Sequence, residues 1–431
     1  MIKAAITPGT HPQSVRRNTI MTDPHPRSTT ANGGKIIANN TCKQLICFLN
    51  KPLRLQRYDN FPNFANFLAK KHQNLAYVKK KPYLCRRNSM RNTYMTTKRI
   101  ALFDVAKAIL IISVFVYHVP AIYLGWVHGT NETIGWLDGV NVRLVNSFFM
   151  AGFFCISGYF LNVQKPLIEC IAKDARIILL PAFLFSLLQN GLYSIFWGNT
   201  AIRFHQYIEL SYWTQISLGY WFLFALFINK LIMQFIIRFV KNGYLMALIA
   251  LSLCVLGLAL KIYAAYNCFN YFEALMMCPM TLVGYFCRQR NVDLSRKHLR
   301  WYALGFVLTM IVLWVTDCSI SGFNLASSFR FDYIPMALWL GLSGTAFVLY
   351  LSSWLERSKV LSYMGTLTLP MFCLNFFFIE AFLRLFMPLL DRWGLVWLYV
   401  PVVLICALGA SFALSALFNT KYLRWILGKI D

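Results

Sequence analysis

From residue 100 to the C-terminus, long apolar segments alternate with short polar breaks. A transmembrane helix needs about 20 mainly apolar residues to cross the hydrocarbon core. By that criterion the pattern predicts spans at residues 101–120, 145–162, 177–197, 217–237, 243–263, 272–287, 301–319, 333–353, 365–386 and 394–418. The span 272–287 is short and contains Glu273, which makes it the weakest of the set. We therefore expect an all-α integral membrane protein built as a bundle of about ten transmembrane helices.

Composition supports this class, because 58% of the 431 residues are hydrophobic and only 13% are charged. That is more apolar surface than a soluble fold of this length buries. Cysteines are numerous, but those within spans are typical small apolar residues, and no Cys-x-x-Cys or Cys/His cluster occurs. We therefore expect neither a metal site nor a bound cofactor.

The net charge of +26 has two sources. Residues 1–94 hold 17 Lys and Arg against Asp23 and Asp59, a net charge of +15. They show no sustained 3.6-residue apolar period and no secretory signal. We interpret residues 1–94 as a basic, disordered tail and residues 95–431 as the membrane domain. Either translation starts near Met90 or Met95, or the tail is a cytoplasmic arm attracted to anionic lipid headgroups. We expect no nucleic-acid partner.

Basic residues also orient the spans, because cytoplasmic loops carry an excess of Lys and Arg. On the side that holds both termini, 17 Lys and Arg flank the predicted spans. On the other side there are four, Arg143, Arg203, Arg330 and Arg392. The asymmetry predicts an even number of spans with both termini in the cytoplasm.

The first span carries three ionisable residues, Asp104, Lys107 and His118. At 100° per residue, Lys107 and His118 fall only about 20° apart around a helix, and Asp104 lies about 40° from His118. An ionisable residue inside a membrane is costly, so a shared polar face is by default a functional-site hypothesis. The predicted orientation puts Lys107 toward the cytoplasm and His118 toward the outer face, separated by about 16 Å.

The spacing Asp104-Val-Ala-Lys107, ten residues, His118 resembles the first-helix signature of the membrane-bound acyltransferase-3 family. Many members have Arg at the position of Lys107. With Lys at this position, the chain is similar to the branch that includes the enterobacterial common antigen O-acetyltransferase and fucose O-acetylases.

Further segments resemble the family in the same order along the chain. They are Phe148 to Phe160 with Ser157-Gly158-Tyr159, Arg176 to Pro181, Gly219 to Leu223 around Trp221, Leu282 to Tyr285, and Leu361 to Asn375. The last segment usually ends in His. Asn375 departs from that pattern, so a proton-transfer role at this position does not carry over.

The resemblance implies transfer of an acyl group, usually acetyl from acetyl-CoA, to a sugar hydroxyl of a surface polysaccharide or lipid-linked glycan at the bacterial inner membrane. A sugar hydroxyl is a weak nucleophile, so a neutral imidazole that takes its proton accelerates the reaction. His118 suits this role, and it also suits a carrier that accepts the acyl group itself. Lys107 would meet the anionic acyl-CoA, with Asp104 holding it in place.

The remaining candidates each have an alternative interpretation. Arg176 is a ligand for the donor phosphates or a topology residue. Substrate binding is the role we consider for Ser157, Tyr159, Trp221 and Asn375. Alternatively, Ser157-Gly158 forms a small-residue helix contact and Trp221 anchors at the interface. We assign Lys165 and Lys173 to topology, and Glu380 and Arg384 to a structural i,i+4 ion pair.

Two other functions compete with acyl transfer. A multi-pass glycan exporter or flippase would also carry intramembrane polar residues, but it predicts matched helix breaks in two halves, which the prolines do not form. A membrane anchor for nucleic acid or another protein rests on the basic tail alone.

The orientation can be measured by cysteine labelling in a background whose 12 native cysteines are replaced by Ser. We expect His128→Cys to react with an impermeant maleimide from outside and Lys297→Cys to react only from the cytoplasm. The reverse pattern, or labelling of both from one side, would remove the predicted placement of Lys107 and His118.

Overall fold

The computed structural model describes residues 82–127, 135, 138–139, 144–198, 204–214, 217–264, 266–316 and 330–429. The residues from Tyr83 onward belong to one compact unit, Tyr83–Asp431. The predicted tail lies outside the described residues up to position 81, and α3 begins at Pro82. The division into tail and membrane domain stays a prediction.

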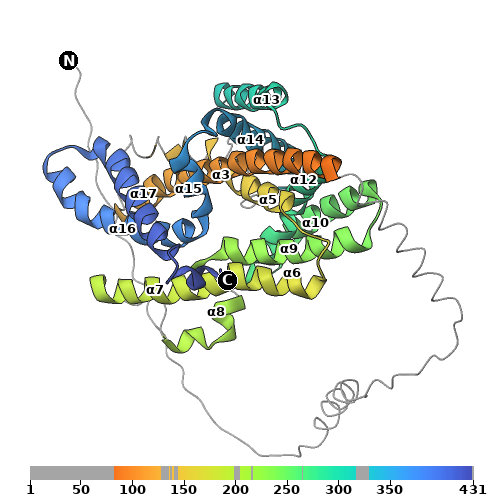
Figure 1. The fold of residues 1–431 in the computed structure, drawn as a ribbon. Coiled ribbons are helices and arrows are strands. Elements are labelled where there is room, and N and C mark those ends of the chain that lie inside the picture. Colours follow the sequence, from red (N-terminus) through yellow and green to blue (C-terminus); the bar gives the residue numbers. More distant parts are fainter. Residues whose placement is uncertain are drawn as a thin grey trace, which may run out of the picture. The chain divides into compact units, whose positions relative to one another are not determined.

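The described residues form helices and contain no strand, which confirms the all-α class. Short 3₁₀ turns and one π-helical segment, η1 (Ala175–Leu179), join the α-helices. The α-helices, shown in Figure 1, are α3 (Pro82–Val127), α5 (Phe149–Tyr159), α6 (Leu167–Asp174), α7 (Leu180–Trp197), α8 (Leu210–Thr214), α9 (Trp221–Phe239), α10 (Gly243–Tyr263), α11 (Tyr271–Met276), α12 (Cys278–Gln289), α13 (Arg296–Val315), α14 (Ile334–Leu355), α15 (Lys359–Thr366), α16 (Thr368–Arg392) and α17 (Tyr399–Phe418).

Seven helical segments of the described residues are long and apolar enough to cross a membrane. They are Ala101–Leu124 within α3, Trp221–Phe239, Gly243–Tyr263, Arg296–Val315, Phe331–Leu355, Thr368–Arg392 and Tyr399–Phe418. Each matches a predicted span. The protein is therefore a multi-pass membrane protein, while the count of ten and the cytoplasmic termini stay predictions.

The other three predicted spans are helical in a different form. Span 145–162 contains α5, which has only 11 residues. Span 177–197 is the end of η1 followed by α7. Span 272–287 is divided at Met277 into α11 and α12, because Pro279 occupies the first turn of α12, where its missing N–H costs no hydrogen bond.

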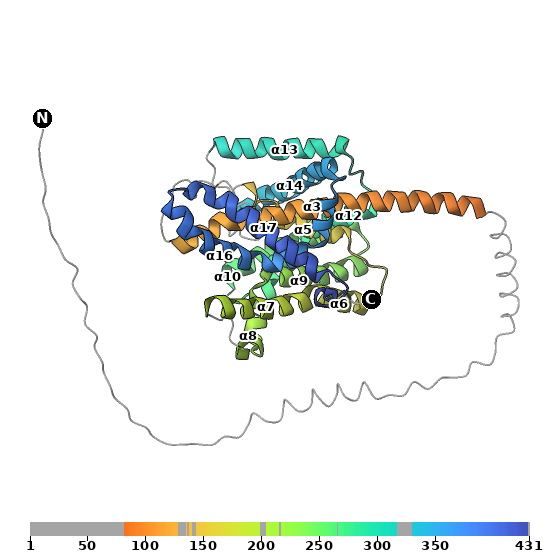
Figure 2. The same ribbon diagram turned by 60° about the vertical axis from the view of Figure 1, so that its left-hand side comes forward.

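The first span is the most deeply packed of the seven, since 56% of its apolar window is buried inside the protein. Only 22% of the corresponding window is buried in α13 and in α17. α13 lies at the periphery of the helical unit in both views (Figure 1, Figure 2). Its large exposed apolar side chains include Trp301, Leu304, Leu308, Ile311 and Trp314. Such a surface is compatible with lipid as the surrounding solvent.

α5 and α12 cross at two glycines. A Cβ atom added at Gly158 would lie 1.9 Å from the carbonyl oxygen of Thr281, and one added at Gly284 would lie 1.8 Å from that of Cys155. Small residues let helix backbones approach this closely in membranes. The helix-contact interpretation of Ser157-Gly158 is therefore confirmed for Gly158.

We expect Gly158→Ala to lower the thermal unfolding midpoint of the purified protein in detergent, because overpacking a close contact costs about 1–3 kcal/mol. Gly409→Ala on α17 is the matched control, since an added Cβ there meets nothing within 4 Å. Ala is favoured over Gly in a helix, so the control should be neutral or slightly stabilising. Equal midpoints for Gly158→Ala and the native protein would contradict the crossing.

Candidate active site

α3 places the polar residues of the first span at two levels. Lys107 Nζ lies 2.7 Å from Asp104 Oδ1, so the predicted pair is formed in the structure. α15 packs directly on this turn, because a Cβ at Gly365 would fall 1.7 Å from the backbone oxygen of Asp104. His118 lies eleven positions further on, about 16 Å along the axis. The two levels face different cavities.

The first cavity, called here the His118 cavity, has a volume of about 460 Å³. Its lining comprises Tyr117, His118, Asn146, Phe149, Met150, Gly219, Tyr220, Trp221, Asn270, Glu273, Phe372 and Phe376. The imidazole of His118 packs with its ring centroid 4.6 Å from that of Phe376. Neither of its ring nitrogens has a hydrogen-bond partner among the described residues. Both nitrogens are therefore available to a molecule in the cavity.

A carboxylate lies in the same cavity. Glu273 on α11 is only 8% exposed. Its Oε2 accepts a hydrogen bond of 2.7 Å from Asn267 Nδ2, and its Oε1 lies 3.4 Å from Lys261 Nζ in the last turn of α10. Next to it, Asn270 has a left-handed backbone and accepts a hydrogen bond from Ser217 Oγ at 2.6 Å. These contacts hold the polar side of the cavity in place.

The second cavity, the Lys107 cavity, has a volume of about 380 Å³. Its polar lining residues are Lys107, Ser157, Lys230 and Thr368, and the others are apolar. Phe372 lines this cavity and the His118 cavity, so it forms part of the wall between them. Its ring centroid lies 5.2 Å from that of Phe222, which packs in turn on Phe153 at 5.5 Å.

The third cavity, the Arg176 cavity, has a volume of about 500 Å³ and shares Phe160 and Lys230 with the second. Lys165, Lys173, Arg176 and Lys230 line it, with Glu169 and Asp174 as the acidic lining residues. Arg176 belongs to the π-helical segment, a type of helix irregularity frequent at functional sites. Four basic against two acidic residues make this lining net positive, which favours an anionic ligand.

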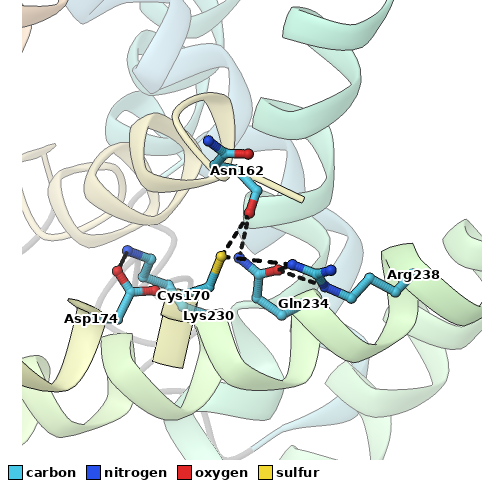
Figure 3. A network of polar contacts seen from close by, with 6 residues as sticks. All are labelled: Asn162, Cys170, Asp174, Lys230, Gln234 and Arg238. Carbon is cyan, nitrogen blue, oxygen red and sulfur yellow. Dashed lines mark hydrogen bonds and ion pairs between the residues drawn. The ribbon is translucent and has the colours of Figure 1, made fainter. Parts of the chain in front are cut away.

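A polar network forms one wall of the Arg176 cavity (Figure 3). Lys230 Nζ lies 2.5 Å from Asp174 Oδ1. Gln234 Nε2 donates to the backbone oxygen of Asn162 at 2.9 Å, and Arg238 Nη2 donates to Gln234 Oε1 at 3.1 Å. The first contact ties α9 to α6, the second ties α9 to the segment between α5 and α6, and the third lies within α9.

The C-terminal segment adds positive charge at the Lys107 level. A Cβ at Gly428 would lie 2.1 Å from the backbone oxygen of Arg176, so the turn after α17 packs against η1. Burial, together with the nearby charges of Lys107 and Arg424, lowers the pKa of Lys429. The described lining at the Lys107 and Arg176 level is net positive, whereas Glu273 is the charged residue among those described as lining the His118 cavity.

The predicted substrate-binding residues divide into two groups. Trp221 lines the His118 cavity, and Ser157 lines the Lys107 cavity. Tyr159 instead packs its ring 4.3 Å from that of Phe103, and Asn375 is fully buried with its Nδ2 unpaired. Neither of these two is among the residues lining the three cavities. The predicted ion pair between Arg384 and Glu380 is present at 2.8 Å.

Sequence reasoning missed several lining residues. Glu273 and Lys230 are ionisable residues inside predicted spans, and that signal was available. It was used for Glu273 only as an argument against the span. Phe372 and Phe376 have no distinguishing sequence signal, because aromatic residues are abundant throughout this chain.

Comparison with known proteins identifies the family. The fold and cavities define a multi-pass membrane protein with a polar site inside its helical unit. A family model described as an acyltransferase domain, that of the acyltransferase-3 family, matches residues 100–416. The chain therefore belongs to the acyltransferase-3 family, and the resemblance predicted from its motifs is confirmed at that level. Searches of curated proteins and of solved structures gave no match.

Proposed function

We propose that this protein transfers an acyl group, which we expect to be acetyl, from acyl-CoA to a sugar hydroxyl of a cell-surface polysaccharide or lipid-linked glycan. Membership of the acyltransferase-3 family supports acyl transfer in general. The observation that carries the finer proposal is the series of three adjoining cavities, a cationic one, one at Lys107 and one at His118.

The donor fits the cationic end. Acyl-CoA carries its negative charges on the phosphates of its nucleotide part, and Arg176 and Lys173 would bind them in the Arg176 cavity. We thereby move Lys173 from a topology role to a binding role, because it lines this cavity. The long pantetheine arm then runs through the Lys107 cavity, whose lining is mainly apolar. Lys107, held by Asp104, would offset the negative charge of the CoA phosphates where the pantetheine arm enters the Lys107 cavity. Acyl-CoA is a co-substrate in this scheme, with no bound cofactor.

The chemistry takes place at His118. The imidazole takes the proton of the sugar hydroxyl while the hydroxyl oxygen attacks the thioester carbonyl carbon. The tetrahedral intermediate collapses by breaking the C–S bond, and the departing CoA sulfur takes the proton from the imidazolium. In the alternative order, a ring nitrogen of His118 first displaces CoA and then passes the acyl group to the sugar.

The proposed acceptor rests on the first-helix motif, and the proposed orientation in the membrane rests on the distribution of Lys and Arg. Lys107 stands where many members have Arg, and in this the chain is similar to the branch that includes the enterobacterial common antigen O-acetyltransferase and fucose O-acetylases. We therefore propose an acceptor of the kind that this branch uses, a sugar of a surface glycan. We place the protein in a bacterial inner membrane, with the Arg176 cavity on the cytoplasmic side and the lipid bilayer as its environment.

Phe372 is expected to limit the length of the acyl group, because its ring lies in the wall between the donor and acceptor cavities. Phe372→Ala should raise the use of butyryl-CoA relative to acetyl-CoA by roughly ten-fold, the scale of discrimination for added methylenes in a pocket. Phe382→Ala is the control, since Phe382 stacks on Phe378 and Phe386 on the same helix and lines none of the three cavities. An unchanged ratio in Phe372→Ala would contradict this route.

His118→Ala should lower O-acylation of the glycan by about 10²–10⁴-fold, the usual contribution of a general base. The variant protein should still insert, and unmodified glycan should still reach the surface. Lys107→Arg keeps the charge and should retain activity, whereas Lys107→Ala should weaken donor use. Mass analysis of surface glycans measures all three.

Expression must be compared for Lys107→Ala, because it leaves Asp104 without its partner. Intact acylation in His118→Ala would overturn the role of His118. Blocked export of unmodified glycan in that variant would favour the exporter or flippase instead.

A further inference from the structure

The His118 cavity has a charge pattern that selects its ligand. We propose that Glu273 recognises the acceptor sugar, and that this sugar is uncharged rather than a uronic acid or another acidic sugar. The inference rests on the proposed function, because it takes the His118 cavity to be the acceptor site. It concerns binding specificity and not the transfer step.

Glu273 is the one Asp, Glu, Lys or Arg among the residues described as lining this cavity. The Arg176 cavity differs, since its lining holds four basic and two acidic side chains and is net positive. Lys261, the cation nearest to Glu273, is not among the lining residues of the His118 cavity. A ligand in the cavity therefore meets the carboxylate of Glu273 as part of the lining, whereas Lys261 is not part of it.

The Glu273 carboxylate retains hydrogen-bonding capacity. An ionised carboxylate has about four acceptor sites on its two oxygens. Asn267 donates to Oε2, and Lys261 lies beside Oε1. The remaining acceptor sites suit the hydroxyl groups of a sugar, which donate hydrogen bonds. The same sites repel a second carboxylate or a phosphate.

Structural stability does not account for placing a carboxylate here. Burying an ion pair carries a desolvation penalty that its attraction often does not repay. Glu380 offers a comparison, since it pairs with Arg384 and accepts a hydrogen bond from Tyr193, and it lines none of the three cavities. Glu380 pairs within α16 and is tied to α7 by Tyr193, whereas Glu273 pairs with Lys261 of α10 and is also presented to a cavity.

The rest of the lining agrees with a neutral sugar. Trp221 and Tyr220 contribute aromatic side chains, whose apolar faces suit the C–H groups of a sugar ring. Asn146 and Asn270 add amide groups, so that this part of the lining is polar without a net charge. His118 lines the same cavity, so a sugar held by Glu273 lies within the space that the imidazole faces.

Two probes that differ at one carbon test the proposal. p-Nitrophenyl β-D-glucopyranoside and p-nitrophenyl β-D-glucuronide differ in having CH₂OH or a carboxylate at C6. Binding of each to the purified full chain in detergent is measured by saturation-transfer difference NMR titration. We expect the glucoside to bind about ten-fold more tightly than the glucuronide, the scale of one hydrogen bond to a charged group.

Glu273→Gln keeps the size of the side chain and removes its charge. It should weaken glucoside binding by about ten-fold and narrow the difference between the probes. Glu380→Gln, the matched control, should leave both affinities unchanged. Preferential binding of the glucuronide by the native protein, unchanged glucoside binding in Glu273→Gln, or an equal loss in Glu380→Gln would overturn the proposal.

Acetyl transfer from acetyl-CoA to the glucoside is measured on the same samples, so that the two proposals fail separately. Glu273-dependent binding with no His118-dependent transfer would overturn the proposed function and keep the role of Glu273 in sugar binding. Transfer to both glycosides at equal rates, unaffected by Glu273→Gln, would overturn the role of Glu273 and keep the acyltransferase.

Discussion

The packing of one polar helix face inside an apolar helical unit is the constraint on which the site depends. Asp104, Lys107 and His118 lie on α3, whose spanning part is the most buried of the seven apolar segments. Ionisable side chains are costly in such surroundings unless they are paired or face a cavity. Asp104 and Lys107 satisfy this by pairing with each other, and His118 satisfies it by facing a cavity. The neighbouring helices pack around the Asp104–Lys107 pair and around the cavity that His118 faces.

Close helix crossings fix the geometry of the walls. The reciprocal glycines of α5 and α12 bring Ser157 to the Lys107 cavity, and Gly365 brings α15 against the backbone at Asp104. α16 begins two residues after α15 and contributes Phe372 and Phe376 to the lining of the His118 cavity. The charge of the lining changes along this path, from net positive at Arg176 to one carboxylate, Glu273, among the described residues that line the His118 cavity. That gradient matches an anionic donor at one end and a hydroxylated acceptor at the other.

Local patterns predicted much of this arrangement, and tertiary contacts decided the rest. The hydropathy pattern located every helix that meets the length and apolarity criterion, and the 3.6-residue period placed Asp104, Lys107 and His118 on one face. Motif order identified the family. The pattern did not predict the division at Met277, because apolar residues continue on both sides of it and span length alone does not mark the break before Pro279. Nor did it place Tyr159 and Asn375, whose burial depends on helices distant in sequence. In the sequence Glu273 was an argument against the span 272–287, whereas in the structure it lines the His118 cavity.

The central claim is that the three adjoining cavities join a donor on one side of the membrane to an acceptor on the other. Proteoliposomes with oriented protein test it most directly, with acetyl-CoA on the side of the Arg176 cavity and p-nitrophenyl β-D-glucopyranoside only on the opposite side. The account predicts acetylated glucoside on the acceptor side, free CoA on the donor side, and neither product with His118→Ala. Acetylation that requires both substrates on the same side of the bilayer would contradict it.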